Sequence, residues 1–215
     1  QLTFMAAFIS CLIGIPLGIL SALKRNTWID GIIRVIALLG VSVPGFASAT
    51  LLILFLSLVF QYYSPVGYVG LFENPSINMQ IMILPSIILG TSMSGSVMRM
   101  TRSSVLEILR QDFIKAIRAK GAPEKVTIFK HALKNGLIPI ITLVGMQIGS
   151  LLGGAVVTEQ IFSIPGLGLM TLTAINQRDY PVIQGCVLFI AFIYVMINLL
   201  VDILYTYVDP RITYK

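Results

Sequence analysis

The sequence predicts an all-α membrane protein, a polytopic bundle of helices with about five spans. Only 11% of its 215 residues are charged and 56% are hydrophobic, whereas soluble domains carry about 25% charged residues. The apolar residues gather into runs of about 20, the length that a helix needs to cross a bilayer. These runs are continuous and do not alternate with polar residues as the strands of a membrane barrel do. A disordered chain and a water-soluble globule are therefore excluded.

The predicted spans follow one another along the whole chain, which we interpret as one transmembrane domain over residues 1–215. None of them carries a charged residue away from its ends. Longer extracytoplasmic loops are expected over 61–80 and 162–181. The spans are Leu2–Leu23, Val35–Phe60, Ile81–Met98, Gly136–Ile161 and Val182–Tyr205.

The first span begins almost at the first residue. Gln1 is not an initiator methionine, and it stands directly before an apolar run. That run has neither the basic n-region nor the cleavage site of a signal peptide. We therefore expect that an N-terminal part containing a further span precedes this sequence.

Basic residues define the orientation of the spans. Fourteen of the 15 Lys and Arg residues fall in loops on one side, and Arg178 alone falls on the other. The positive-inside rule places the richer side in the cytoplasm, so we expect the N-terminus of the chain outside and its C-terminus in the cytoplasm. The basic residues of the richer side are Lys24, Arg25, Arg34, nine residues between Arg99 and Lys134, Arg211 and Lys215.

The loop over 99–134 combines charge with a helical pattern. It contains nine basic and three acidic residues, and its net charge of +6 equals that of the whole chain. Apolar residues recur at every fourth position, as they do on one face of a helix. The recurring residues are Val105, Leu109, Phe113 and Ile117.

Both ends of this loop helix have sequence signals. Ser103 or Ser104, with Glu107 following, resembles a capping box at the start. Gly121 and then Pro123 are typical of a helix end. A second helix is expected from about Glu124 to Lys134, leading into the fourth span.

Three interpretations of this basic loop compete. It could lie on anionic lipid, as basic amphipathic helices do. It could instead dock into a groove of a cytoplasmic partner. Binding to nucleic acid is not expected, because the loop contains no groove-reading motif.

Small residues in the fourth span suggest close helix packing. Gly145, Gly149 and Gly153 stand four residues apart, a spacing that lets helix backbones approach one another in a bilayer. The contact could join two subunits or two helices of one chain.

Polar residues within spans are candidates for lining a transport pathway. We expect Gln147 to be the strongest, because a full amide in hydrocarbon needs a partner or a cavity. Ser and Thr hydroxyls more often bond to the backbone of their own helix. The candidate pathway residues are Thr50, Ser94, Gln147 and Ser150.

The sequence contains no constellation of a catalyst. It has no phosphate-binding loop of the G-x-x-x-x-G-K-[ST] type, and no Ser/His/Asp, paired-carboxylate or Cys/His arrangement. His131 is its one histidine, whereas a metal site needs several clustered ligands. We therefore predict no catalytic residues, no metal site and no cofactor in this chain.

The segment IKAIRAKGAPEKVTIFKHALKNGLIP (114–139) resembles the cytoplasmic "EAA" loop of ABC-importer permeases. Ala116 and Gly121 match the Ala and Gly positions of that loop. Lys115 and Ile117 depart from its Glu and second Ala, as in the branch of dipeptide, oligopeptide and nickel permeases. Other segments in family order also resemble this branch, namely 13–30, 99–109, 159–168, 176–185 and 198–212.

The resemblance implies a permease subunit of an ATP-driven importer in a bacterial or archaeal plasma membrane. Such a subunit forms half of a pathway for peptides or a related small solute such as nickel, which an extracytoplasmic binding protein delivers. Its other partners are a second homologous permease and two ATP-binding cassette subunits, which bind ATP and Mg.

The resemblance also assigns a role to the loop, which in this family forms a coupling helix that sits in a cleft of an ATP-binding subunit. The carried-over docking positions are Ala116 and Gly121, flanked by Glu107, Asp112, Arg118 and Lys120. Gly121 has a reason of its own, since the turn there requires a positive φ.

The alternatives are a secondary transporter or channel that is not coupled to ATPase subunits, and a membrane scaffold whose loop lies on lipid. A secondary transporter normally needs ionisable or unwound-helix sites near the bilayer midplane. No charged residue stands at that depth here.

Overall fold

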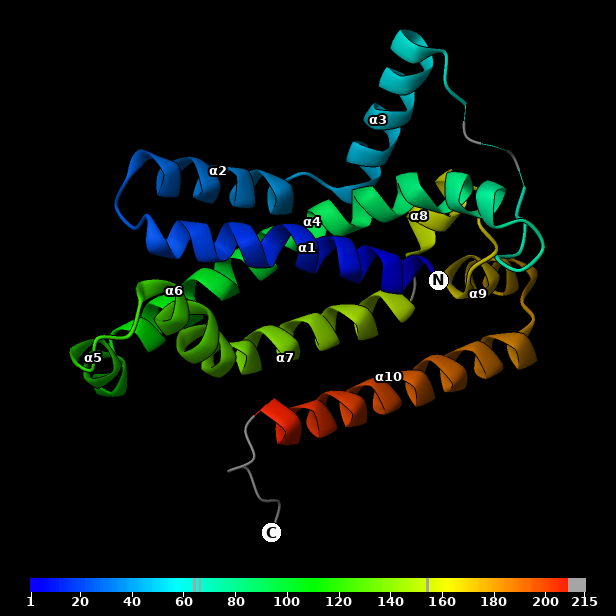
Figure 1. Ribbon diagram of the computed structural model, residues 1–215. Helices are drawn as coiled ribbons and strands as arrows, with labels where there is room; N and C mark the ends of the chain where they lie inside the picture. The colour runs from blue at the N-terminus through cyan, green and yellow to red at the C-terminus, as the bar shows by residue number, and fades with distance from the viewer. Residues whose placement is uncertain (64, 66, 154, 209–215) are drawn as a thin grey trace.

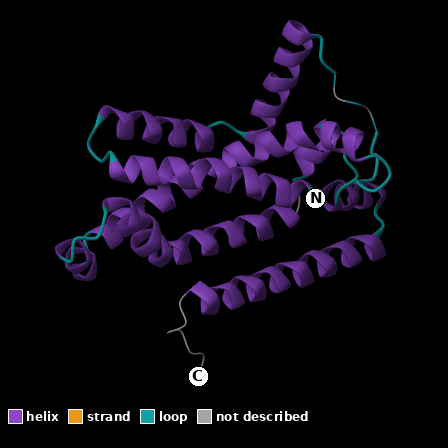
Figure 2. Ribbon diagram, viewed as in Figure 1, coloured by secondary structure: helices purple, strands orange, loops and turns teal. Residues whose placement is uncertain are grey.

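The computed structural model describes residues 1–63, 65, 67–153 and 155–208, with side chains as far as Leu204. All regular structure in these residues is helical (Figures 1 and 2). Arg211, Lys215 and the end of the 198–212 segment lie outside the described residues.

The helices follow one another from α1 to α10, with one π-helix, η1, between α6 and α7 (Figure 1). Their bounds are α1 Leu2–Leu23, α2 Trp28–Ser42, α3 Gly45–Phe60, α4 Pro75–Leu109, α5 Asp112–Ala119, α6 Glu124–Val126, η1 Thr127–Ala132, α7 Leu133–Leu152, α8 Val156–Ile161, α9 Leu167–Gln177 and α10 Tyr180–Val208.

The number of spans agrees with the prediction. Among the described residues, four helical segments are long and apolar enough to cross a membrane, and α2 with α3 makes up to a fifth. The four are α1, α4, the continuous run Glu124–Leu152 that ends with α7, and α10. The predicted all-α polytopic bundle is confirmed.

The second predicted span, Val35–Phe60, is not one straight helix. It begins earlier, at Trp28, and bends by 98° between α2 and α3. Proline explains the break, because it has no N–H to donate and it forces the residue before it out of the helical region. Val43 is extended accordingly, with φ −83° and ψ 122°. Beyond Pro44, α3 projects away from the other helices (Figure 1).

The predicted start of the loop helix at Ser103 or Ser104 is wrong. Both residues lie inside α4, which runs without interruption for 35 residues to Leu109. Thr101, Ser104 and Val105 are buried there, so tertiary packing continues the helix beyond the apolar run. The chain breaks only at Arg110–Gln111, which divides the apolar repeat between α4 and α5.

The fourth predicted span, Gly136–Ile161, is also divided. The helix ends at Leu152, and the short α8 follows as a separate element. Most of the loop expected over 162–181 is taken up by α9. This short helix lies at the end of the molecule opposite α5 (Figure 1).

Glycines allow α1 and α4 to pack at close range. A Cβ added at Gly18 would lie 2.6 Å from Thr101 Cβ and 2.7 Å from the Met98 carbonyl oxygen. A Cβ at Gly90, on α4, would lie 2.8 Å from the Ala6 carbonyl oxygen. Side chains at these positions would force the two helices apart, so the contact depends on glycine.

Two glycines of the predicted packing motif, Gly145 and Gly149, lie on α7 and face α10, and Gly153 is the C-cap residue of that helix. A Cβ at Gly145 would collide with Val201, and one at Gly149 would lie 2.5 Å from the Tyr194 ring. Gly153 is less crowded, with Ile190 at 3.8 Å. In this structure the motif therefore serves packing within one chain.

Apolar side chains cover much of the molecular surface. Only 6% of the apolar window of α10 is buried, and Ala49 is the one buried residue of α3 among those described. A surface of this kind is compatible with lipid or with a further membrane subunit.

Replacing Gly18 should destabilise the protein. We expect Gly18→Ala to lower the free energy of unfolding by about 1–3 kcal/mol, since it overpacks a contact with the α4 backbone. Gly31→Ala is the matched control, because a Cβ at Gly31 meets nothing within 4 Å. Thermal unfolding in detergent would compare them, and equal midpoints would contradict the role of glycine in the α1–α4 contact.

Candidate functional site

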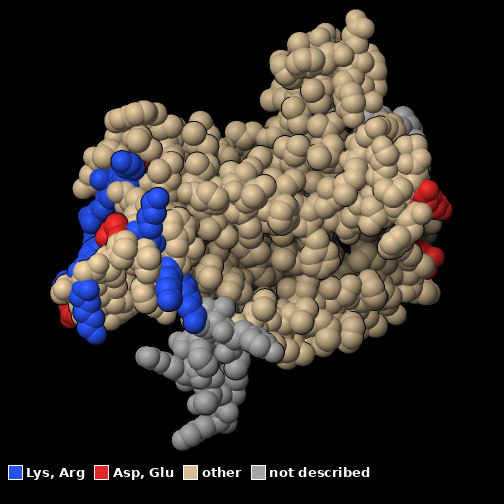
Figure 3. Space-filling model, viewed as in Figure 1, with Lys and Arg blue, Asp and Glu red and all other residues tan. Residues whose placement is uncertain are grey.

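Basic side chains gather at one end of the molecule. Figure 3 shows Lys and Arg around α5, α6 and the α1–α2 turn, while the opposite end of this face shows acidic side chains only. This segregation along the direction of the long helices is the one that the positive-inside rule predicts. The candidate coupling site lies at the basic end.

The loop is anchored to the transmembrane helices by apolar residues. Ile114 of α5 is fully buried, whereas Phe113 is 37% exposed. Ile128 of η1 is buried with Ile19, Ala22 and Val105 in one cluster of α1, α4 and η1. The loop is therefore an ordered extension of the helical core.

The predicted docking residues all lie on the exposed surface of this extension. Glu107 stands near the end of α4, Asp112 begins α5, and the others follow on α5 and the turn after it. Each of the six is exposed, namely Glu107, Asp112, Ala116, Arg118, Lys120 and Gly121.

Two exposed ion pairs lie along the loop. Lys115 Nζ donates to Asp112 Oδ1 at 2.8 Å, and the Lys115 ammonium lowers the pKa of Asp112. Arg118 donates twice to Glu124, at 2.6 and 3.1 Å. The second pair joins α5 to α6 across the turn. Exposed pairs contribute little stability, so the loop is held mainly by its buried apolar residues.

The turn after α5 requires glycine for its backbone and not for space. Gly121 has φ +80°, and nothing lies within 4 Å of a Cβ built there. The Gly121 amide donates to the Arg118 carbonyl at 2.9 Å, and the Ala122 amide donates to the Ile117 carbonyl at 3.4 Å. This is the hydrogen-bond pattern of a Schellman helix end. The predicted positive φ is confirmed.

The π-helix η1 was not predicted from the sequence. It replaces most of the second loop helix expected over Glu124 to Lys134, and α7 begins at Leu133. Short π-helical turns are rare and occur often at functional sites. His131 lies within η1, and the described residues contain no cluster of potential metal ligands.

Sequence reasoning also missed a buried ion pair beside this loop. Asp30, in the first turn of α2, is fully buried, and Arg102 of α4 donates to both of its oxygens, at 2.8 and 2.9 Å. The Ser21 hydroxyl and the Asn26 amide donate to it at 2.6 and 3.1 Å. One signal could have found it, since Asp30 is the only acidic residue before Glu73.

The candidate pathway residues are not gathered in one place. The Thr50 hydroxyl donates to the Phe46 carbonyl at 2.9 Å, and the Ser94 hydroxyl donates to the Thr91 carbonyl at 2.7 Å. Each hydroxyl is therefore bonded within its own helix. Ser150 is exposed on α7.

Gln147 differs from the other pathway candidates because it bridges two helices. Its Nε2 donates to the Met93 carbonyl of α4 at 3.5 Å, a long hydrogen bond. Its Oε1 is buried and has no hydrogen-bond partner. A buried, unpartnered amide oxygen is costly and calls for an explanation.

A buried carboxylate organises the opposite end of the molecule. Glu159 of α8 accepts a hydrogen bond from the Leu169 amide at 2.7 Å. It thereby caps α9, whose N-cap residue is Gly166 and has no side chain to do so. A Cβ at Gly166 would collide with the Glu159 carboxylate. The Glu and Gly of the 159–168 segment therefore depend on each other.

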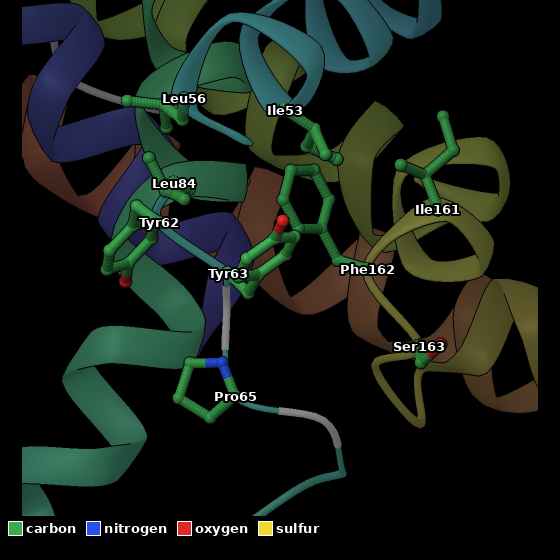
Figure 4. Close-up of a pocket in the computed structure, with 9 residues that line it drawn as sticks. All are labelled: Ile53, Leu56, Tyr62, Tyr63, Pro65, Leu84, Ile161, Phe162 and Ser163. Carbon is green, nitrogen blue, oxygen red and sulfur yellow. The ribbon is translucent and has the colours of Figure 1, made fainter. Parts of the chain in front are cut away.

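An apolar pocket lies at the same end, in the angle between α3 and α8 (Figure 4). Its volume is about 250 Å³, and two tyrosines and one phenylalanine contribute to its wall. No sequence signal predicted it, because its wall combines residues from distant elements. The pocket is lined by Ile53, Leu56, Tyr62, Tyr63, Pro65, Leu84, Ile161, Phe162 and Ser163.

Residues 14–214 match the family of binding-protein-dependent transport system inner membrane components. The chain belongs to this family. The match covers nearly all of the residues described above, including the basic loop, and it confirms the resemblance that the loop sequence indicates.

Several permease proteins from other organisms align with the whole of this chain. A dipeptide transport system permease protein of Alkalihalophilus pseudofirmus is 45% identical, over all of this chain and 70% of the relative. Its Escherichia coli counterpart is 40% identical with the same coverage. A putative peptide transport system permease protein of Brucella abortus is 42% identical, over all of this chain and 68% of the relative.

The fold also has a solved counterpart. A chain of the inward-facing MetNI methionine ABC transporter superposes with a TM-score of 0.75, covering 97% of this chain and 91% of that chain. The two sequences are only 19% identical, so this comparison shows a shared fold and nothing further.

Glu159 should control the order of α9. We expect Glu159→Ala to free the Leu169 amide and to cost about 1.5–3 kcal/mol of local stability, the usual contribution of a hydrogen bond to a charged group. Hydrogen exchange over 167–171 should then accelerate. Glu159→Gln keeps an acceptor and should exchange more slowly than the Ala variant, and Gln160→Ala alters only an exposed neighbour. Unchanged exchange in Glu159→Ala would contradict the capping role.

Proposed function

We propose that this chain is the transmembrane permease subunit of an ATP-driven importer and forms half of a pathway for peptides. The observation that carries the proposal is 45% identity over the entire chain to a dipeptide permease. The names of the relatives favour peptides over nickel as the solute. In this proposal a second homologous permease supplies the other half of the pathway, and an extracytoplasmic binding protein delivers the solute.

The proposed coupling site is the exposed face of the basic loop. An ATP-binding subunit would contact the ends of α4 and α5 and the Gly121 turn, where the six docking residues are exposed. The buried side chains of Ile114 and Ile128 support this role, because they connect the loop to the transmembrane core. Force applied to the loop would therefore reach the spans. ATP and Mg would be bound by the two partner subunits and not by this chain.

The proposed orientation places the basic end in the cytoplasm and the α9 end outside. The distribution of Lys and Arg supports it. In this orientation α9 and the pocket beside α8 face the binding protein, α10 runs back across the bilayer, and the C-terminus is cytoplasmic.

The rival function is a secondary transporter or channel subunit without ATPase partners. The two functions predict different results for a loop variant, because only the importer loses uptake when its loop no longer contacts an ATP-binding subunit. Gly121 offers the sharpest test, since a substitution there meets open space and leaves the transmembrane packing intact.

Gly121→Asp should uncouple transport. It places a negative charge and a strained backbone on the docking face, and we expect the affinity for the ATP-binding subunits to fall at least about tenfold, as for a central interface residue. ATP-driven uptake in proteoliposomes should fall with it, while membrane insertion stays normal.

The matched control is Gly67→Asp, because Gly67 also has a positive φ, +94°, and open space around it, but lies in the loop between α3 and α4. Gly121→Ala separates backbone strain from charge and should retain more activity than Gly121→Asp. Undiminished ATP-driven uptake in Gly121→Asp would remove the coupling proposal.

Gln147→Leu should separate stability from transport. Leucine eliminates the buried, unpartnered Oε1, so we expect unfolding stability to be unchanged or higher by about 1 kcal/mol. If Gln147 lines the pathway, uptake should fall even so. Thermal unfolding and uptake are measured on the same preparation, with the exposed neighbour Met146→Leu as control. Full uptake in Gln147→Leu would refute a pathway role.

A further inference from the structure

The buried carboxylate of Asp30 connects three elements at the cytoplasmic end. Arg102 reaches it from α4, Ser21 from the last turn of α1, and the Asn26 amide from the turn between α1 and α2. Asn26 has φ +62°, a conformation that Asn tolerates better than most residues. The turn thereby aims its amide at the carboxylate.

These contacts leave the carboxylate little freedom. Its two oxygens accept four hydrogen bonds from described donors, and Asp30 has no exposed surface. A bidentate pair between a guanidinium and a carboxylate has a fixed planar geometry. Moving α4 away from α1 and α2 would strip a buried charge of its strongest partner, which is strongly unfavourable.

Arg102 is also directly connected to the proposed coupling loop. It lies seven residues before Leu109, on a helix that continues without a break to the end of α4. A groove of about 390 Å³ opens beside this helix end and is lined by Arg102, Ser103, Leu106, Glu107 and Arg110. The Arg102 side chain therefore lines the same surface groove as the docking residue Glu107, while its guanidinium donates hydrogen bonds to Asp30.

We infer that Asp30 and Arg102 are positioning residues that make α1, α2 and the cytoplasmic end of α4 follow the coupling loop as one body. The inference rests on the proposed function. Displacement of α5 moves the end of α4, and the ion pair transmits that displacement to the α1–α2 turn. The close glycine contacts between α1 and α4 then carry it along the spans.

The test uses the complete transporter in proteoliposomes, with solute uptake and ATP hydrolysis measured together. The variants are Asp30→Asn, Arg102→Gln and the double variant. Arg34→Gln is the matched control, because Arg34 lies 3.6 Å from the same carboxylate but is 58% exposed. Thermal unfolding of each complex is recorded in parallel.

We expect the number of solutes taken up per ATP hydrolysed to fall at least about fivefold in both single variants, the lower range of coupling between distant sites. Arg34→Gln should stay at the wild-type ratio. The double variant removes the buried charge of Asp30 together with its partner Arg102 and should regain thermal stability relative to the single variants, but its uptake per ATP should remain low. If the ion pair only stabilised the fold, the double variant would regain coupling together with stability.

Two results would overturn the inference. One is a wild-type ratio in Asp30→Asn, and the other is a double variant that regains coupling together with stability. If the single variants fail to fold, the double variant and Arg102→Lys decide, since Arg102→Lys keeps the charge and loses the bidentate geometry. The wild-type arm tests the proposed function separately, because a chain that is not an ABC permease would show no ATP-dependent uptake at all.

Discussion

The close packing of α1 against α4 is the contact on which the rest of the molecule is assembled. Lipid tails are as apolar as leucine, so helices in a bilayer associate through shape and not through exclusion of water. Gly18 and Gly90 supply that shape, because they let each helix approach the backbone of the other. The same contact buries Thr101 and Val105 and therefore keeps α4 helical into the cytoplasmic loop. The position of the basic end of the molecule therefore depends on the packing of α1 against α4.

Much of the fold could be predicted because the bilayer fixes the length and polarity of a span. The failures occur where local patterns and tertiary contacts disagree. A proline within a span is a sequence signal for a bend, but Pro16, Pro85 and Pro139 lie inside continuous helices, and only Pro44 stands at a break. The residues over 99–109 are polar enough to suggest a loop, yet α1 packs against them and the helix continues. The apolar repeat from Val105 to Ile117 is helical, but it is divided between two helices, α4 and α5.

The candidate site shows the same difference between local patterns and contacts that join distant residues. The positive φ at Gly121 follows from a local helix-end pattern, so the sequence was sufficient to predict it. Asp30 and Arg102 are 72 positions apart, and no local pattern connects them. Glu159 and Gly166 lie closer in sequence, but their mutual dependence appears only when the carboxylate is seen to occupy the space that a Cβ would fill.

These contacts also indicate where the molecule can move. Glycine packing and a buried ion pair hold α1, α2 and α4 together, and glycines on α7 hold that helix against α10. Between α4 and α7 the hydrogen bond at Gln147 is long, and its amide oxygen has no partner. A buried polar group without a partner gains from rearrangement, and the Ser10, Ser86 and Thr101 hydroxyls of α1 and α4 share this condition. Gln147 differs from these hydroxyls because its other amide atom bonds to a second span. A shift of α7 against α4 would therefore change the hydrogen bonding of the residue that the sequence marks as the strongest pathway candidate.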